Sequence, residues 1–410
     1  MQMNQTPSAE RIHIGFFGRR NAGKSSVLNA VTSQNLAVVS NVKGTTTDPV
    51  QKAMELLPLG PVVVIDTPGI DDEGSLGALR VKKSYQVLNK VDAAVLIVDG
   101  TLGLCKEDYA FIEQIEKKQI PYAVVFNKSD LTMADNLTDH IDYLKEKNIP
   151  ALTVSANTNT GIQELKETLA TITKQEESKR RIVADLLRAS DFVVLVVPID
   201  SAAPKGRLIL PQQQTIRDIL DANATAIVVK ETELKETLAQ LGKKPRLVIT
   251  DSQVFAKVSA DTPKDILLTS FSILFARYKG NLNTVIEGVT ALNSIKDKDK
   301  ILIAEGCTHH RQCGDIGTEK LPAWIRQYTG AKPEFTFSSG TEFPEDLSSY
   351  KMIIHCGGCM LNEREMKYRL ACAREQKIPI TNYGIAIAYM QGILKRSIEP
   401  FPSISKLLND

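Results

Sequence analysis

The chain has 410 residues, more than one ordinary hydrophobic core can use, and the length alone predicts about two to four domains. Apolar residues make up 43% and charged residues 24%, which is the profile of a folded protein without a bias toward disorder. Lysine and arginine total 50 against 48 acidic residues, so the net charge of +2 disfavours binding to nucleic acid or to an anionic membrane. With no apolar run long enough to span a membrane and no apolar signal sequence, we expect a cytoplasmic protein.

Short apolar segments alternate with helical stretches over the first part of the chain. The expected strands are IHIGFF (12–17), PVVVID (61–66), AAVLIVD (93–99), YAVVFN (122–127) and ALTVSA (151–156). Such alternation predicts a mostly parallel α/β sheet with helices on both faces, the doubly wound fold. The wholly polar segment 174–181 is typical of a linker, so we place a first domain at residues 1–175.

Two smaller α/β domains are expected to follow. Strands at 191–198, 225–230 and 246–250 form a set without phosphate loop, Cys or His, which favours an assembly module at residues 176–266. A third set begins with ILIAEG (301–306) and continues with MIIH (352–355) and IPITN (378–382), within a domain at residues 267–410.

A phosphate-binding loop follows the first expected strand. Gly18-Arg-Arg-Asn-Ala-Gly-Lys-Ser fits the pattern G-x-x-x-x-G-K-S/T and precedes a helical segment. The backbone N–H groups of such a loop face phosphate oxygens, while Lys24 neutralises the β- and γ-phosphates and Ser25 gives a hydroxyl to Mg²⁺. The predicted phosphate-binding residues are Gly18, Asn21, Ala22, Gly23, Lys24, Ser25 and Ser26.

Two further segments predict guanine as the base. Asn127-Lys128-Ser129-Asp130 ends the strand YAVVFN, and the Asp130 carboxylate can accept both N–H donors of the guanine edge, which adenine lacks. Asn127 and Lys128 are expected to pack the loop and the ring. Ser155 and Ala156 follow the residues ALTV (151–154) at the end of a later expected strand, where a backbone N–H could meet the guanine carbonyl. The nucleotide pair is therefore GTP and GDP.

The segment Asp66-Thr67-Pro68-Gly69 closes another strand. An aspartate in this place reaches Mg²⁺ through water, and the Gly69 N–H can contact the γ-phosphate. Each of these segments alone could be a plain turn, but all of them stand in order at the carboxyl ends of strands, where parallel sheets bind ligands.

These motifs, with Gly44-Thr-Thr-Thr-Asp48, resemble the TrmE/Era (MnmE/Era) branch of translation-factor-related GTPases over residues 12–175. The resemblance implies that Thr46 is a further Mg²⁺ ligand, that Asn21 accompanies a bound K⁺, and that Lys24, Thr46 and Gly69 act in hydrolysis. Ile70 stands where Ras-like proteins have a water-orienting glutamine, so we expect slow intrinsic hydrolysis, stimulated by potassium.

Cysteine and histidine concentrate near the C-terminus, where five of the six cysteines fall in the last 104 residues. Cys307 and His309 follow one expected strand, and His355-Cys356-Gly-Gly-Cys359 overlaps the end of another. If those strands are neighbours in a parallel sheet, both loops open at one edge and can share a metal. Spacing alone favours zinc, held by Cys307, Cys356, Cys359 and a histidine, over a redox dithiol or an inert turn.

A [4Fe–4S] cluster with three thiolates and an exchangeable fourth ligand is the alternative. A CxH motif followed by HCxxC, on one chain with this GTPase segment, resembles the HydF family of [FeFe]-hydrogenase maturation GTPases. The stretches VVLVVPIDSAAPKGRLILPQQQTIRDIL (193–220) and ILIAEGCTHHRQCGDIGTEKLPAWI (301–325) resemble that family too.

The resemblance implies a homodimeric scaffold with a [4Fe–4S] cluster on Cys307, Cys356 and Cys359. His309, His355 or Glu305 is the candidate fourth ligand, and Cys105, Cys313 and Cys372 lie outside the motif. The scaffold would accept a diiron precursor made by two radical-SAM maturases, HydE and HydG, and deliver it to apo-[FeFe]-hydrogenase. A ribosome- or tRNA-related GTPase with a zinc module is the alternative function, and a thiol oxidoreductase is a third.

Overall fold

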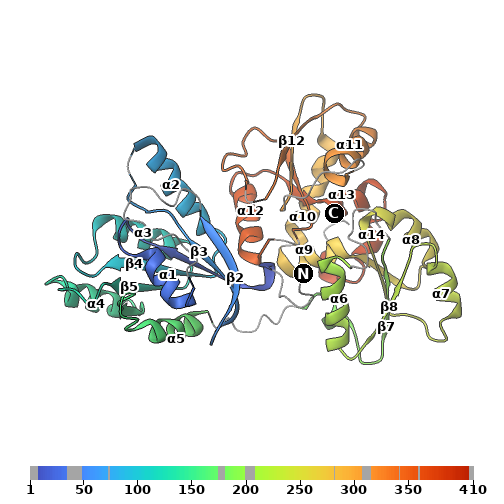
Figure 1. Ribbon diagram of the computed structural model, residues 1–410. Helices are drawn as coiled ribbons and strands as arrows, with labels where there is room; N and C mark the ends of the chain where they lie inside the picture. Colours follow the sequence, from blue (N-terminus) through green and yellow to red (C-terminus); the bar gives the residue numbers. More distant parts are fainter. Residues whose placement is uncertain are drawn as a thin grey trace. The chain divides into compact units, whose positions relative to one another are not determined.

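The computed structural model describes residues 8–34, 49–72, 74–173, 181–198, 208–280, 282–306, 315–340, 342–358 and 361–405. The chain divides into two compact units, Met1–Ser178 and Lys179–Asp410 (Figure 1). Each unit has its own hydrophobic core. Among the described residues, no helix has the length and apolar character needed to cross a membrane.

The first unit is built on a six-stranded sheet with the order β2-β3-β1-β4-β5-β6. Every neighbouring pair is parallel except β2 and β3, which form an antiparallel hairpin. The strands are β1 (Ile12–Phe17), β2 (Val50–Leu56), β3 (Gly60–Asp66), β4 (Ala93–Asp99), β5 (Tyr122–Asn127) and β6 (Ala151–Thr153). The predicted doubly wound fold is confirmed.

Helices cover both faces of this sheet, after a short 3-10 turn η1 (Ser8–Glu10). Apolar side chains of α1 and α5 belong to the core on one face, and those of α2, α3 and α4 to the core on the other. The central strands β1, β3, β4 and β5 are almost wholly buried, which is why they appear in the sequence as continuous apolar runs. The helices are α1 (Lys24–Thr32), α2 (Gly74–Val87), α3 (Lys106–Lys117), α4 (Leu137–Glu146) and α5 (Ile162–Ile172).

The second unit holds two four-stranded parallel sheets, with the orders β10-β9-β7-β8 and β12-β11-β13-β14. One continuous core of buried side chains joins them. The first sheet has β7 (Phe192–Val196), β8 (Thr225–Val229), β9 (Leu247–Thr250) and β10 (Leu267–Ser270). The second has β11 (Lys300–Ala304), β12 (Glu334–Ser338), β13 (Met352–His355) and β14 (Ile380–Asn382). The division into three domains stays a prediction.

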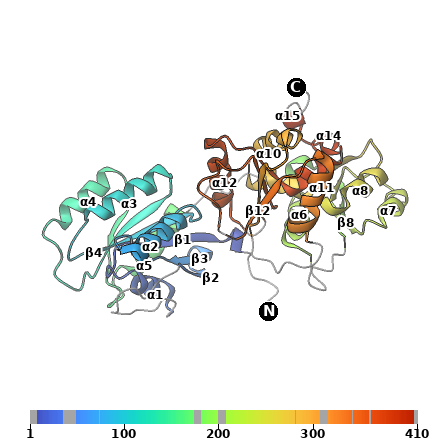
Figure 2. The ribbon, with the colours of Figure 1, turned by 90° about the horizontal axis from the view of Figure 1, so that it is seen from above.

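Helices pack around both sheets of this unit, and α7 packs against α8 (Figure 2). They are α6 (Leu210–Asp221), α7 (Leu234–Gln240), α8 (Phe255–Asp261), α9 (Phe271–Lys279), α10 (Leu282–Val289), α11 (Leu321–Thr329), α12 (Glu363–Glu375), α13 (Tyr383–Met390), α14 (Leu394–Ser397) and α15 (Pro402–Ser405). Shorter turns are η2 (Ala184–Leu186), η3 (Ser252–Val254), η4 (Thr290–Ser294) and η5 (Ile316–Lys320). Arg396 on α14 binds the C-terminal end of α8. Its guanidinium donates hydrogen bonds to the carbonyl oxygens of Ser259 at 2.6 Å and Thr262 at 2.8 Å.

Candidate nucleotide and metal sites

The predicted phosphate loop leaves β1 and enters α1, and two of its glycines are required by space. Gly18 has a φ of 141°, and a Cβ there would lie 2.1 Å from the Ile97 carbonyl oxygen on β4. Gly23 has a φ of 90°, and its Cβ would lie 2.2 Å from Asn127 Nδ2. Because any side chain would meet these atoms at positive φ, only glycine lets the backbone follow this path.

The residues expected to meet phosphate and Mg²⁺ lie together at the start of α1. Lys24 is buried, and its Nζ donates to the Arg19 carbonyl oxygen at 2.8 Å. Ser25 Oγ donates to Asp66 Oδ2 at 2.7 Å, which brings the two predicted magnesium residues into contact. Burial lowers the pKa of Lys24, although the Asp66 carboxylate raises it.

The donor set beside Lys24 suits a hard cation. Asp66 Oδ1 is buried and has no hydrogen-bond partner within the described part of the chain. Burial raises the pKa of Asp66, although Ser25 and Lys24 lower it. A bound Mg²⁺ with its waters would give this oxygen a partner and favour the charged carboxylate. Thr46, the other predicted magnesium ligand, lies outside the described residues.

The predicted guanine loop is tied to the phosphate loop by one side chain. Asn127 Nδ2 donates to the Ala22 carbonyl oxygen at 3.0 Å, and Asn127 Oδ1 accepts from the Ala156 N–H at 3.1 Å. Three predicted binding segments therefore meet at Asn127. Ser26 lies beside Ser25 in the first turn of α1.

The Asp130 carboxylate is exposed and already oriented. Ser155 Oγ donates to Asp130 Oδ1 at 2.6 Å, and Asn157 Nδ2 donates to Asp130 Oδ2 at 3.4 Å. The hydrogen bond from Ser155 lowers the pKa of Asp130, so this group stays an acceptor. The carboxylate is thus available to a base that offers N–H donors.

Asp99 at the end of β4 is a residue that the sequence analysis missed. Lys128 Nζ donates to Asp99 Oδ2 at 2.5 Å, and the N–H and hydroxyl of Thr101 both donate to Asp99 Oδ1. Burial raises the pKa of Asp99, but these hydrogen bonds from Lys128 and Thr101 outweigh it and lower the pKa. The feature of the sequence that could have pointed to Asp99 is its position at the end of a predicted strand, which in the sheet lies beside the strand that ends with Asn127.

The segment after Gly69 lies against the phosphate loop. The Ile70 N–H donates to the Gly18 carbonyl oxygen at 3.2 Å, and the Arg20 N–H donates to Asp71 Oδ1 at 2.6 Å. Asp72 lies 3.7 Å from Arg20 Nε. Gly69 thus stands next to the phosphate loop, and its contact with the γ-phosphate stays a prediction.

A buried carboxylate links the phosphate loop to α3. Asp108, with no exposed surface, accepts from Arg19 Nε at 3.1 Å and from the Cys105 N–H at 3.0 Å. The second contact caps the N-terminus of α3. Arg19 also donates to the Gly103 carbonyl oxygen at 3.4 Å.

The strands before the two Cys/His motifs are neighbours, which confirms the condition set by the sequence. β11 pairs with β13 in parallel, with Ala304 opposite His355. The Cys356 N–H donates to the Ala304 carbonyl oxygen at 2.8 Å. The segments that lead to Cys307 and to Cys359 therefore leave the sheet at the same edge.

Two backbone N–H groups point at the sulfur of Cys356. Gly306 donates to Cys356 Sγ at 3.0 Å and Gly358 at 3.4 Å. Hydrogen bonds of this kind stabilise a thiolate and tune iron–sulfur clusters, so the surroundings of this sulfur fit a cluster ligand. Cys307, Cys359, His309 and Cys313 lie outside the described residues. Among the residues that are described, no three His, Cys, Asp or Glu gather as a metal site.

His355 uses both ring nitrogens inside the protein. Its Nε2 lies 2.9 Å from Arg369 NH1, and its Nδ1 lies 2.7 Å from the Cys356 carbonyl oxygen. Since a guanidinium can only donate, Nε2 is the acceptor and Nδ1 carries the proton. Burial, with the nearby Arg369 charge, lowers the pKa of His355 to about 3. Glu305, the third candidate ligand, accepts a hydrogen bond from the Tyr383 hydroxyl at 3.2 Å.

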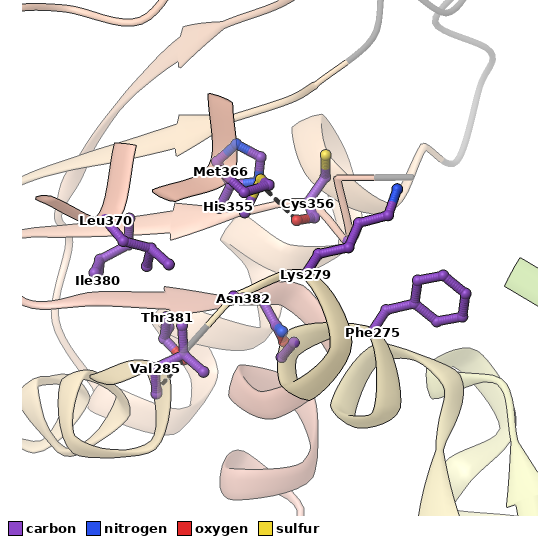
Figure 3. Close-up of a pocket in the computed structure, with 13 residues that line it drawn as sticks. Phe275, Lys279, Val285, His355, Cys356, Met366, Leu370, Ile380, Thr381 and Asn382 are labelled. Atoms are coloured by element: carbon purple, nitrogen blue, oxygen red, sulfur yellow. Dashed lines mark hydrogen bonds between the residues drawn. The ribbon is translucent and has the colours of Figure 1, made fainter. Parts of the chain in front are cut away.

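A pocket opens beside Cys356 (Figure 3). Lys279 at the end of α9 lines it and donates to the Leu361 carbonyl oxygen at 3.1 Å. Most other lining side chains are apolar, namely Phe275, Ala276, Val285, Met366, Leu370 and Ile380. Away from it, Cys372 on α12 packs against the core of the unit, and Cys105 precedes α3.

Comparison with known proteins first defines the class. Residues 13–128 match the family model for a 50S ribosome-binding GTPase. A tRNA modification GTPase MnmE from Desulfotalea psychrophila is 34% identical over 158 residues, which is 38% of this chain and 33% of that protein. A GTPase Der from Wolinella succinogenes is 31% identical over 195 residues, 45% of this chain and 40% of that protein. With the phosphate and guanine loops in place, the first unit is a P-loop GTPase domain.

The chain spans about a third of the length of the MnmE relatives that it matches. A solved structure of a variant of Aquifex aeolicus Era, bound to GDP and aluminium fluoride, covers 56% of this chain and 98% of its own, at 20% identity and a TM-score of 0.37. Residues 182–280 match the hydrogen maturase F dimerization domain, and residues 283–400 match the hydrogen maturase F tetramerization domain. The chain therefore belongs to the hydrogen maturase F (HydF) family, and the predicted resemblance is confirmed.

Proposed function

We propose that this chain is a GTP-hydrolysing scaffold that holds a [4Fe–4S] cluster, accepts a diiron precursor and delivers it to apo-[FeFe]-hydrogenase. The observation that carries the proposal is the parallel pairing of β11 with β13 in a chain of the HydF family. That pairing puts Gly306, which precedes Cys307, within hydrogen-bonding distance of the Cys356 sulfur. A cluster bound there supplies an iron with an exchangeable ligand, to which the cargo can attach.

Three thiolates are assigned to the cluster, from Cys307, Cys356 and Cys359. Gly306 and Gly358, the residues directly before Cys307 and Cys359, both donate to Cys356 Sγ. Consecutive Cα atoms are about 3.8 Å apart. Cys307 and Cys359 are therefore each the chain neighbour of a glycine whose N–H donates to the sulfur of the third ligand, Cys356. For the fourth ligand we favour His309 or Glu305, because each ring nitrogen of His355 already has a hydrogen-bond partner that it would have to give up to bind iron.

The pocket beside Cys356 is the proposed place for the diiron cargo. Its mainly apolar wall would keep water away from a guest, and the buried Lys279 at the end of α9 offers a positive charge in the lining. We assign delivery of the precursor to HydE and HydG and its acceptance to apo-hydrogenase, all within the cytoplasm.

In the GTPase domain we assign Lys24, Thr46 and Gly69 to the γ-phosphate and Asp130 to guanine. Ser25 and Thr46 would bind Mg²⁺, with Asp66 acting through water. Asn21 adopts a φ of 60° in the phosphate loop and is the proposed companion of K⁺. Equal hydrolysis rates in sodium and potassium buffers would exclude the potassium assignment.

A second copy of the chain is proposed to pair along β8. This strand is the edge of its sheet, and its Val228 is 45% exposed. An open parallel edge offers unpaired backbone groups to another strand, and residues 182–280 match a dimerization domain. The homodimer is therefore assigned to this edge.

The test is to replace each proposed ligand in turn, with Cys307→Ser, Cys356→Ser and Cys359→Ser, in protein purified without oxygen. We expect loss of iron, sulfide and hydrogenase activation, while GTP hydrolysis stays near the wild-type rate. Cys372→Ser is the matched control, since this cysteine packs against the core of the same unit. Joint loss of cluster and GTP hydrolysis would instead indicate a structural metal.

The relatives of the GTPase domain support a second candidate, a ribosome- or tRNA-related GTPase with a zinc module. Metal analysis of wild-type protein separates the two. About four iron and four sulfide per chain support the carrier. One zinc without iron, together with RNA binding at physiological salt, would support the second candidate.

A further inference from the structure

A buried polar network lies behind the proposed ligand Cys356. Arg369 on α12 has no exposed surface, and its guanidinium makes three polar contacts. Nε donates to Glu365 Oε1 at 2.9 Å, NH1 to His355 Nε2 at 2.9 Å and NH2 to the Gly340 carbonyl oxygen at 2.7 Å. Its Cζ atom also lies 5.1 Å from the centre of the Phe343 ring. The network therefore joins α12, β13 and the turn after β12.

Stability alone does not account for this arrangement. Removing a guanidinium and a carboxylate from water costs several kcal/mol, and apolar side chains of the same volume often stabilise a core as well or better. What such a network does provide is a fixed geometry, because each of the three guanidinium nitrogens of Arg369 has a set acceptor. The function of the network is therefore to be found in the groups that it holds in place.

A chain of hydrogen bonds leads from Arg369 on α12, through His355, to the turn that contains the proposed ligand Cys356. Because Arg369 can only donate, it fixes His355 in the tautomer that carries the proton on Nδ1. That N–H donates to the Cys356 carbonyl oxygen. The peptide bond after Cys356 is thereby held, and it leads to Gly358, whose N–H contacts Cys356 Sγ.

We propose that Arg369 is a positioning residue of the metal site, which acts through His355 to hold the Cys356 turn with its sulfur facing the amides of Gly306 and Gly358. This role rests on the proposed function only in taking Cys356 as a cluster ligand. Partners behind a metal ligand typically change metal affinity by about 10–100-fold when they are removed. Hydrogen bonds to ligand sulfur also set the reduction potential of a cluster.

Two substitutions of His355 separate its two contacts. His355→Gln puts an amide near Nε2, where it can meet Arg369, but it cannot reach the Cys356 carbonyl. His355→Asn puts an amide near Nδ1, where it can still donate to that carbonyl. We expect Arg369→Gln and His355→Gln to lower the midpoint reduction potential of the cluster and to alter its EPR spectrum. Both variants should also lose iron to a chelator about 10–100-fold faster than wild type. His355→Asn should lie closer to wild type.

Arg396→Gln is the matched control, since Arg396 also donates to backbone carbonyls in this unit but has no contact with the Cys356 turn in the described residues. It should lower the melting temperature and leave potential, EPR spectrum and iron loss unchanged. If Arg369→Gln and both His355 variants behave like Arg396→Gln, Arg369 is merely structural and the proposal is overturned. If Arg369→Gln does not fold, the His355 pair decides.

Hydrogen–deuterium exchange of metal-free protein gives a readout that needs no cluster. Faster exchange at the amides of Gly306 and Gly358 in Arg369→Gln and His355→Gln, but not in Arg396→Gln, supports the positioning role. Unchanged exchange overturns it. Wild-type protein that binds no iron would defeat the carrier proposal alone, because the exchange result stands without it.

Discussion

At the scale of single residues, Asp130 gives the clearest test of base selection. In Asp130→Asn the side chain keeps one acceptor oxygen and turns an N–H donor toward the guanine edge, where the base also has donors. We expect affinity for GTP to fall about 10–100-fold, which corresponds to the loss of a charge-assisted hydrogen bond. Xanthosine triphosphate, with a carbonyl in place of the 2-amino group, should bind the variant better than GTP. Equilibrium titration with a fluorescent nucleotide measures both.

Asp135→Asn is the control for this substitution, since Asp135 is exposed and lies in the loop that follows. Unchanged GTP affinity in Asp130→Asn would show that another group reads the base.

Residues whose role is local could be predicted from the sequence. Gly18 and Gly23 stand where the loop pattern requires glycine, and the structure gives each a positive φ. The contact of Lys128 with Asp99 and the state of His355 could not be predicted, because both depend on strands and helices brought together by folding. In the sequence His355 looks like a metal ligand, and only the packing of α12 behind it shows that both nitrogens are used.

At the scale of elements, Asp108 connects α3 with the phosphate loop. Asp108→Ala leaves the Cys105 N–H and the Arg19 guanidinium without this acceptor, so we expect a loss of about 1–3 kcal/mol in the free energy of unfolding. GTP affinity should fall as well, because Arg19 belongs to the loop. Asp108→Asn keeps the volume and one oxygen and should lose less. Chemical denaturation with and without nucleotide measures both effects.

The same carboxyl gives a dependence on pH. Burial raises the pKa of Asp108, although Cys105 and Arg19 lower it. The folded state then holds this proton more tightly than the unfolded chain, so its contribution to stability falls as the pH rises from about 4 through the folded-state pKa. The stability of wild type relative to Asp108→Asn should therefore decrease over this window. A difference that grows with pH would contradict the assigned burial.

Central strands could be predicted because burial on both faces leaves a continuous apolar run. β2, β10 and β12 were missed, and the reasons are physical. β2 and β12 are edge strands with largely exposed side chains, so polar residues interrupt their patterns. β10 has only four residues and runs directly into α9, so its apolar residues merge with those of the helix.

At the scale of the whole molecule, the proposed dimer through β8 can be tested with one charge. Val228→Lys puts a solvated ammonium on the exposed edge, where close approach of a second strand would have to remove its water. We expect the dissociation constant of the dimer to rise at least about tenfold while GTP binding is unchanged. Analytical ultracentrifugation over a concentration series measures this. Gln240→Lys, an exposed change on α7, is the control, and an unaffected Val228→Lys dimer would place the interface elsewhere.

The pairing of β11 with β13 also bears on the order in which the protein is made and loaded. Gly306 and Cys356 are 50 positions apart. The entropic cost of closing that loop is offset by the free energy of forming the sheet and its apolar core. Small zinc domains differ, because in them the metal itself drives folding. Here the apo chain should fold first and bind its iron afterwards, because its fold does not depend on the metal. Exhaustive chelation should then strip the metal and leave the far-ultraviolet circular dichroism spectrum intact.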